Sequence, residues 1–229
     1  MTDSALAERL ESVKARIASA ASNSNRSVSD IQLVVVTKNH SAQLPLALLD
    51  LGETNFGENR DQEASAKALE VQQLKPDLAT WHFVGQLQSN KVRSMLEYTS
   101  VLHSLDRDSL LSELVKQLAK SPDSSIQAFI ELNLTEDPKR GGLDPQLISN
   151  FTERVLSQPQ IKLLGVMGVV GLGVEPAFDF ERIAKASIEV QKLAPNANQI
   201  SAGMSGDFEQ AIAFGATHLR IGTAITGNR

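Results

Sequence analysis

The sequence predicts an α/β fold, a single (β/α)8 TIM barrel with an extra helix at the N-terminus. Strand-like and helix-like segments alternate along 229 residues, and the eight strands that we count are separated by crossover helices. The length is about what such a barrel needs. A doubly wound open sheet is the alternative, because alternation alone does not show that a sheet closes. No linker rich in proline, glycine or serine divides the chain, so residues 1–229 are expected to form one domain.

Each element follows from the spacing of apolar residues. Residues 4–22 carry apolar side chains at helical spacing, among them Leu6, Leu10 and Val13, and predict an opening amphipathic helix. A polar loop from Asn23 to Ser27 leads into the first strand. The predicted strands are 31–37, 53–56, 81–85, 100–104, 126–133, 162–168, 199–203 and 218–222. The predicted helices are 42–51, 60–74, 87–97, 107–120, 144–157, 177–194 and 207–214, with a last short helix after Gly222.

Composition excludes several classes of protein. The absence of cysteine excludes disulfides, thiolate metal sites and cysteine nucleophiles, and the four histidines lack the close spacing of metal ligands. A net charge of −5 with both signs interspersed gives no reason to expect a nucleic-acid surface. No segment approaches the roughly 20 apolar residues of a membrane span, and the N-terminus lacks the pattern of a signal peptide. We therefore expect a soluble, cytoplasmic protein with no metal, nucleic-acid or membrane partner.

Lys38 follows the β-branched apolar run from Ile31 to Thr37, which is typical of a strand buried on both faces. A lysine at the carboxyl end of that strand would project into the mouth of the fold, above a hydrophobic floor. Partial desolvation there would favour the neutral amine, which can attack a carbonyl carbon and form a Schiff base. The alternative is a lysine that ends a strand and extends to water.

Two glycine-rich segments predict a phosphate site after the last two strands. Gly203, Ser205 and Gly206 lie between a strand and a helix, and Gly222 and Thr223 repeat the arrangement after the final strand. Glycines allow close approach, hydroxyls donate hydrogen bonds, and helix N-termini favour anions. Loops after strands seven and eight are the common phosphate site of these barrels. The alternative is that Ser205 or Asp207 is an ordinary helix cap.

Arg220 lies within the last strand, and its side chain alternates to the face opposite Leu219 and Ile221. A guanidinium inside a barrel mouth needs an acceptor, because it stays charged. That acceptor could be a carboxylate or a pyridine nitrogen. Further polar residues, Asn59 and His82, fall at the ends of strands two and three, where barrel active sites are built.

Ordered motifs along the chain resemble the pyridoxal phosphate homeostasis proteins, the YggS/PROSC-type family, over nearly the whole sequence. The resemblance implies an alanine racemase-like barrel in which Lys38 holds pyridoxal 5′-phosphate (PLP) as a Schiff base. It also implies that Ser205, Gly222 and Thr223 hold the phosphate and that Arg220 faces the pyridine nitrogen. The motifs are Val36-Thr-Lys38, Phe56-Gly-Glu-Asn59, Trp81-His-Phe-Val-Gly-Gln-Leu-Gln-Ser-Asn-Lys91, His103-Ser-Leu-Asp-Arg107, Gly165-Val-Met167, Ser201-Ala-Gly-Met-Ser205 and Arg220-Ile-Gly-Thr-Ala-Ile225.

The resemblance further implies that Asn59 and His82 are pocket residues around the ring. Two segments depart from the family pattern. Arg140-Gly-Gly142 stands where the family usually has Lys-x-Gly, and Val169-Val-Gly171 replaces a stretch that often carries proline.

The chemistry of Arg220 favours a cofactor carrier over a catalyst. An arginine at the ring nitrogen opposes its protonation and leaves the ring a weak electron sink. A racemase of this barrel type needs a second base, and the single tyrosine, Tyr98, lies near the start of strand four. We expect a PLP homeostasis protein without established turnover, with apo PLP-dependent enzymes as recipients. Because a barrel closes without a partner, we expect a monomer.

Two alternatives are a racemase-like PLP enzyme acting on amino acids and a sugar-phosphate enzyme with a Schiff-base lysine. The first lacks an identified second base. The second needs an acid–base group near Lys38, for which Glu58 is the only plausible residue.

Overall fold

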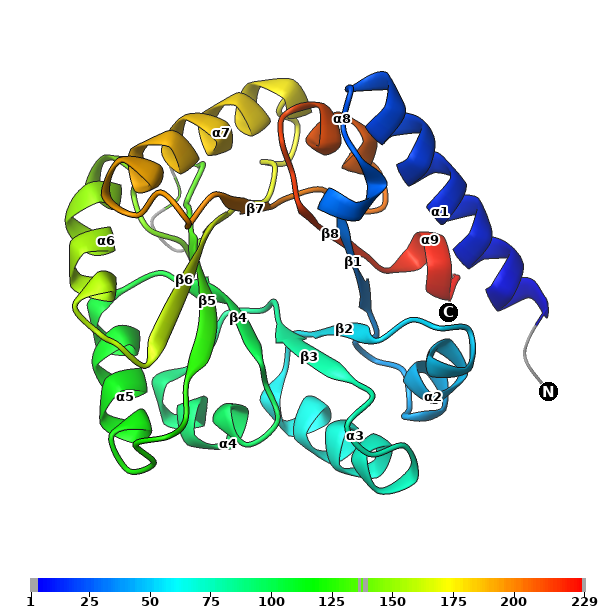
Figure 1. Cartoon of the computed structure of the whole chain (residues 1–229), viewed down its shortest axis with the longest axis horizontal. Helices are drawn as coiled ribbons and strands as arrows, with labels where there is room; N and C mark the ends of the chain where they lie inside the picture. Colours follow the sequence, from blue (N-terminus) through cyan, green and yellow to red (C-terminus); the bar gives the residue numbers. More distant parts are fainter. Residues whose placement is uncertain (1–3, 136, 138–139, 228–229) are drawn as a thin grey trace.

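The strands close into one barrel. This computed structural model describes residues 4–135, 137 and 140–227, in which the eight strands pair in chain order and the last pairs with the first. All of these pairings are parallel. The closed barrel confirms the predicted fold and excludes the open sheet. Figure 1 shows the helices surrounding the strands.

Helices and strands alternate throughout the described ranges. The strands are β1 (Gln32–Val36), β2 (Asn55–Glu58), β3 (Thr80–Phe83), β4 (Val101–Leu105), β5 (Ile126–Glu131), β6 (Ile161–Met167), β7 (Gln199–Ser201) and β8 (His218–Ile221). The α-helices are α1 (Ser4–Asn23), α2 (Gln43–Asp50), α3 (Asp61–Leu74), α4 (Val92–Leu96), α5 (Asp108–Leu118), α6 (Ile148–Leu156), α7 (Pro176–Leu193), α8 (Phe208–Ala213) and α9 (Thr223–Thr226). Short 3-10 helices are η1 (Val28–Asp30), η2 (Ser89–Lys91) and η3 (Pro145–Leu147).

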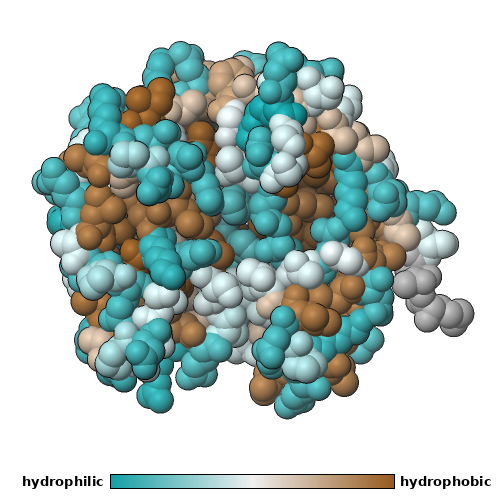
Figure 2. Space-filling view, in the orientation of Figure 1, coloured by the Kyte–Doolittle hydropathy of each residue, from teal (hydrophilic) through white to brown (hydrophobic). Residues whose placement is uncertain are grey.

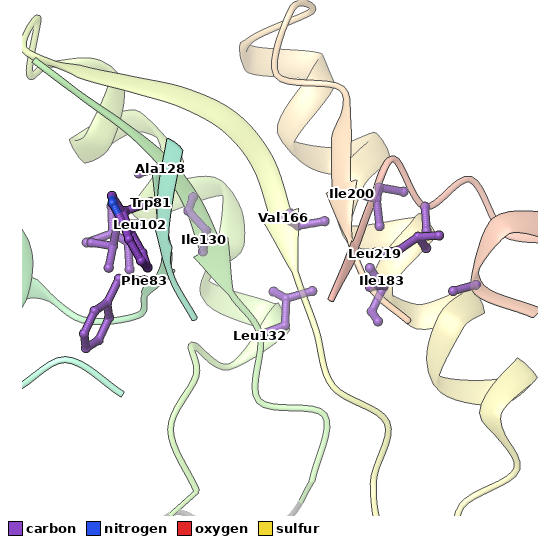
Figure 3. Close-up of a cluster of buried hydrophobic side chains, with 14 of the residues drawn as sticks. Trp81, Phe83, Leu102, Ala128, Ile130, Leu132, Val166, Ile183, Ile200 and Leu219 are labelled. Atoms are coloured by element: carbon purple, nitrogen blue, oxygen red, sulfur yellow. The ribbon is translucent and has the colours of Figure 1, made fainter. Parts of the chain in front are cut away.

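The two faces of the barrel wall differ in character. Outward-facing strand residues pack beneath the helices in one large apolar cluster. Figure 3 shows part of this layer, with Leu102, Ile130 and Val166 on the strands and Ile183 on α7. Burying such side chains stabilises the fold by about 1.5–3 kcal/mol each. The inner face carries many polar side chains, and they build the candidate site described below.

The extra N-terminal helix is present as predicted. α1 buries an apolar stripe that includes Leu6, Leu10 and Val13. It packs against α8 and α9, as Figure 1 shows, and Arg9 Nε donates to the carbonyl oxygen of Ile225 at 2.7 Å. α1 thus supports α9, which directly follows β8, the strand that closes the barrel.

Two predicted boundaries in the first half of the chain are shifted. β2 lies two residues later than predicted, because Gly52 (φ 86°) and a bond from the Glu53 amide to the Leu48 carbonyl lengthen the turn after α2. The predicted helix 87–97 is split into the 3-10 turn η2 and the short α4.

β5 ends at Glu131, two residues before the predicted end. The Leu143 amide donates to the Glu131 carbonyl oxygen, and the Asn133 amide donates to the Leu143 carbonyl oxygen. The backbone after Glu131 therefore pairs with its own following loop. Within the described ranges, no helix is both long and apolar enough to cross a membrane.

Candidate functional site

Lys38 lies in the turn that follows β1, at the carboxyl edge of the barrel. Val34 and Val36 form the inner face of β1, since a Cβ added to Gly57 on the neighbouring strand would lie 3.2–3.3 Å from their methyl groups. If the alternation of β1 continued for two more residues, Lys38 would share the inner face with Val34 and Val36. Lys38 is exposed in the structure, so the partial desolvation expected from the sequence stays a prediction.

The loops after β7 and β8 meet at the same edge. Ser205 Oγ accepts a hydrogen bond from the amide of Ala224 at 3.3 Å, which joins the two glycine-rich segments. Asp207 is the N-cap residue of α8, but its carboxylate accepts from the Met204 amide at 2.6 Å. Ser205 therefore does not cap α8, and its hydroxyl lies between the two loops.

Gly222 places the end of β8 against β1. A Cβ on Gly222 would lie 3.5 Å from the carbonyl oxygen of Val36. Thr223 is exposed and begins α9. The hydroxyls and amides predicted to bind phosphate thus border the strand that leads to Lys38.

Arg220 is buried inside the barrel, with 5% of its surface exposed. Its guanidinium donates to Ser201 Oγ at 2.5 Å and to the carbonyl oxygen of Gly168 at 2.9 Å. Burial lowers the pKa of Arg220 to about 10, against the opposing charges of Glu131 and Asp207, so it remains charged at neutral pH. Among the described residues, the acceptors of these two hydrogen bonds are a hydroxyl and a carbonyl oxygen. Neither is the carboxylate that the sequence suggested as one possible partner.

A chain of hydrogen bonds extends from Arg220 across the barrel. Ser201 Oγ lies 2.8 Å from His103 Nδ1, and His103 Nε2 lies 2.9 Å from His82 Nδ1. The second nitrogen of His82 lies 3.0 Å from Asn55 Oδ1. Because Asn55 Oδ1 can only accept, His82 carries its proton on Nε2, and each group then donates to the next in one direction starting from Arg220. As neutral rings, His82 and His103 each have a hydrogen-bond partner on both nitrogens.

Electrostatics favour the same protonation state. Burial lowers the pKa of His82 to about 3 and that of His103 well below its usual value. His218, whose ring centroid lies 6.2 Å from that of His103, has its pKa lowered to about 4 by burial and by Arg220. Within the described residues, no group of three histidine, aspartate or glutamate side chains is arranged to hold a metal. Figure 2 shows hydrophilic side chains at the centre of the face that it presents.

Asn59 directly follows β2, and Gly85 lies beside it in the loop after the adjacent strand β3. A Cβ on Gly85 would lie 2.4 Å from the Asn59 carbonyl oxygen, so only glycine allows these two loops to approach. Asn59 Oδ1 is buried and has no hydrogen-bond partner among the described residues. The predicted residue His82 lies deeper, and with both nitrogens engaged it offers a bound molecule only its ring carbons.

Glu131, which the sequence did not single out, ends β5 on the same face as Phe129. Its carboxylate accepts from Gln86 Nε2 at 2.5 Å. Burial raises the pKa of Glu131 to about 7, and the nearby Asp106 adds to this while Arg220 opposes it. The mouth therefore contains a carboxyl group that titrates near neutral pH.

The residues invoked by the two alternatives lie outside the barrel lumen. Glu58 is buried against α3, where its Oε1 lies 2.6 Å from Lys67 Nζ. Asp61 is the first residue of α3, and its Oδ1 accepts a hydrogen bond from the Tyr98 hydroxyl at 3.3 Å. Neither group lines the mouth beside Lys38.

The two departures from the family pattern contact each other. Arg140 donates to the carbonyl oxygen of Val170 at 3.4 Å. Gly142 has a φ of 115°, and its amide donates to Asp106 Oδ2 at 3.1 Å. Arginine at position 140 thus joins the loop after β5 to the loop after β6.

The structure brings Lys38, Ser205, Gly222, Thr223 and Arg220 to neighbouring strands at one edge. Sequence reasoning missed His103, Ser201 and Glu131 as parts of the site. A signal was available, because each is a polar residue at an inward-facing position of a predicted strand.

Comparison with known proteins identifies the family. Residues 9–229 match the family described as alanine racemase, N-terminal domain. A pyridoxal phosphate homeostasis protein of Mycobacterium leprae is 34% identical over 239 residues, covering 98% of this chain and 93% of that protein. Its counterpart in Escherichia coli is 33% identical over 228 residues, covering 98% and 97%.

Solved structures agree with this assignment. PipY of Synechococcus elongatus, solved with PLP bound, has a TM-score of 0.84 and 31% identity, covering 97% of this chain and 100% of that one. Alanine racemase from Corynebacterium glutamicum has a TM-score of 0.70 at 15% identity, covering 99% of this chain and 61% of that one, and shares the fold. The chain therefore belongs to the pyridoxal phosphate homeostasis protein family, whose barrel is that of the alanine racemase N-terminal domain.

Proposed function

We propose that this chain binds PLP and serves in its intracellular supply, with Lys38 holding the cofactor covalently. The observation that carries the proposal is the meeting of three loops at one edge of the barrel. Ser205 contacts the amide of Ala224, and Gly222 lies against the end of β1, two residues before Lys38. An amine and a set of hydrogen-bond donors suited to an anion thus lie at the same end of the barrel.

The groups present fit a phosphorylated aldehyde. Hydroxyls of Ser205 and Thr223, with amides near Gly206 and Gly222, are the donors that a phosphate accepts from. A Cβ added to Gly206 would meet nothing within 4 Å, so this loop has room beside it. When bound, PLP supplies an aldehyde that reacts reversibly with amines. Lys38 Nζ would form the bond to the aldehyde carbon as water leaves.

Arg220 would control the electronics of the ring. Because it stays charged at neutral pH, a pyridine nitrogen facing it is disfavoured from taking a proton. A neutral pyridine is a weak electron sink, so Arg220 disfavours decarboxylation and transamination. Asn59, with its unpartnered amide oxygen, and His82 are proposed to border the ring.

The supply function is favoured over racemisation by the position of the single tyrosine, Tyr98. Tyr98 bonds Asp61 outside the barrel, so it does not supply the base that a racemase needs on the opposite face of the ring. We infer a carrier that works as a monomer in the cytoplasm and hands PLP to apo PLP-dependent enzymes. A racemase-like activity is the second candidate, and Glu131, with its pKa raised to about 7, is the group that would favour it.

Borohydride reduction tests the covalent attachment. The protein is incubated with PLP, reduced, digested and mapped by mass spectrometry, and the pyridoxyl adduct is expected on the peptide containing Lys38. Lys38→Ala should lose the adduct and keep the fold by circular dichroism, because its side chain is exposed. Lys91→Ala, at the end of η2, is the control and should keep the adduct. An adduct on Lys91 with Lys38 unmodified would refute the assignment.

A further inference from the structure

A buried cluster of charges lies behind the turn that carries Lys38. Lys67 of α3 and Glu58 of β2 have side chains only 3% and 1% exposed, and their charged atoms lie 2.6 Å apart. Glu63, one helical turn before Lys67, lies 3.2 Å from the same ammonium. Burying charges costs several kcal/mol per ion unless the pair is well hydrogen-bonded. The cluster therefore calls for a role beyond stability.

The cluster binds the backbone on both sides of Lys38. Lys67 Nζ donates to the carbonyl oxygen of Thr37 at 2.8 Å, and the Thr37 hydroxyl donates to Glu58 Oε1 at 2.6 Å. On the other side, the Asn39 amide donates to Glu63 Oε1. The peptide groups before and after the lysine are thus fixed by residues of α3.

Asn39 adopts a left-handed backbone conformation. Its φ of 62° lies in a region that costs energy for residues other than glycine, although asparagine adopts it more readily than most. The bond from its amide to Glu63 helps to offset that cost. Contacts outside the mouth therefore favour this conformation of the turn.

We propose that Lys67 and Glu63 are positioning residues that hold the Lys38 turn so that its amine meets a phosphate-anchored aldehyde. This inference rests on the proposed function. It predicts that covalent capture of PLP and phosphate-driven binding can be separated by mutation. Glu63 and Lys67 bond the backbone of Asn39 and Thr37, and Glu58 bonds the Thr37 hydroxyl, so their effect on Lys38 is indirect.

Glu63 offers the cleanest test, because its side chain is 28% exposed and its loss should leave the fold intact. Glu63→Ala removes the acceptor for the Asn39 amide, whereas Glu63→Gln keeps an oxygen at that place. At a PLP concentration below saturation, we expect the fraction trapped on Lys38 by borohydride to fall about tenfold in Glu63→Ala, the effect of one lost charge-assisted hydrogen bond. Glu63→Gln should restore most of the capture.

A ligand without an aldehyde separates positioning from general damage. Pyridoxine 5′-phosphate carries the same phosphate and ring but cannot bond covalently to an amine. Its affinity, measured by calorimetry, should be unchanged within twofold in Glu63→Ala. A merely structural role would weaken both ligands together, and that result would overturn the proposal.

Lys67 is tested without leaving a buried charge unpaired. Lys67→Met alone would leave the Glu58 carboxylate buried without its ion-pair partner, and burial already raises the pKa of Glu58. The double variant Lys67→Met/Glu58→Gln removes both charges and still breaks the bond to the Thr37 carbonyl. We expect reduced capture with retained binding of pyridoxine 5′-phosphate. Lys75→Met, which removes the ion pair between the end of α3 and Asp50, is the matched control and should behave as wild type.

The outcomes distinguish this inference from the proposed function. If wild-type protein traps no PLP on Lys38, the proposed function fails. If wild type traps PLP and the Glu63 and Lys67 variants trap it equally well, the positioning role alone is refuted.

Discussion

Arg220 is a buried cation whose hydrogen bonds go to neutral partners. Ser201 accepts from it and donates to His103, which donates to His82, so the guanidinium begins a chain that spans the barrel. A protonated histidine would place a second positive charge in this low-dielectric interior and reverse one donor in the chain. The orientation of Arg220 therefore depends on histidines that stay neutral.

This dependence predicts acid sensitivity that can be measured residue by residue. His82 has a pKa of about 3 in the folded state and about 6.5 when unfolded, so between these values the unfolded chain binds the extra proton. The free energy of unfolding then falls as pH falls, by about 1.4 kcal/mol per pH unit for each such histidine. His82→Gln should reduce the slope by that amount between pH 4 and 6.5 in urea unfolding.

Measurements of the same His82→Gln variant at pH 8 give the cost of altered packing alone. Glu131, with a raised pKa, opposes the trend between pH 4.5 and 7, but it does so equally in both proteins. An unchanged slope would show that His82 is charged in the folded protein.

The phosphate assignment predicts a second residue-scale effect. Ser205→Ala removes a hydroxyl that we assign to the phosphate, and a hydrogen bond to a charged group contributes about 1.5–3 kcal/mol. PLP should therefore bind about tenfold more weakly or worse, as measured by titration of its absorbance. Pyridoxal, which lacks the phosphate, should bind the wild-type protein far more weakly than PLP does. Equal affinity for the two ligands would refute the assignment of Ser205 to the phosphate.

At the scale of elements, the loop between β7 and α8 has its shape set by one glycine. Gly203 has a φ of 91°, and a Cβ there would lie 2.7 Å from the Cβ of Ala211. Gly203→Ala should lower the free energy of unfolding by about 1–3 kcal/mol through strain and overpacking. Gly206→Ala, three residues on, has nothing within 4 Å and should change stability by less than about 0.5 kcal/mol. Chemical denaturation of both variants makes the comparison.

Elements and site residues were predictable to different extents for physical reasons. Lys38 and Ser205 could be placed together from the sequence, because parallel strands bring all their carboxyl ends to one edge. Strand ends were less certain, since β5 ends where its backbone turns to pair with Leu143. The link between His103 and Ser201 joins residues 98 positions apart, and periodicity carries no information about such pairing across a lumen.

At the scale of the whole molecule, the exposure of Lys38 and Thr223 predicts that bound PLP can be transferred. Loaded protein mixed with an apo PLP-dependent enzyme should lose its yellow colour as the enzyme gains activity. PLP that stays on Lys38 without any turnover would instead indicate a sensor. Multiple turnovers of amino-acid racemisation, abolished in Lys38→Ala, would make the protein an enzyme.

The closure of the barrel has a consequence for the order in which the site forms. Lys38 follows the first strand, whereas Arg220, Gly222 and Thr223 belong to the last strand and the turn after it, and β1 pairs directly with β8. During synthesis on the ribosome, the lysine emerges well before the groups that would anchor its ligand, since 182 positions separate Lys38 from Arg220 (220 − 38). A ligand that contacts residues after both β1 and β8 binds only the folded, closed barrel, and it stabilises that state by RT ln(1 + [L]/Kd). The fraction of chains with a closed barrel should therefore rise with the concentration of that ligand.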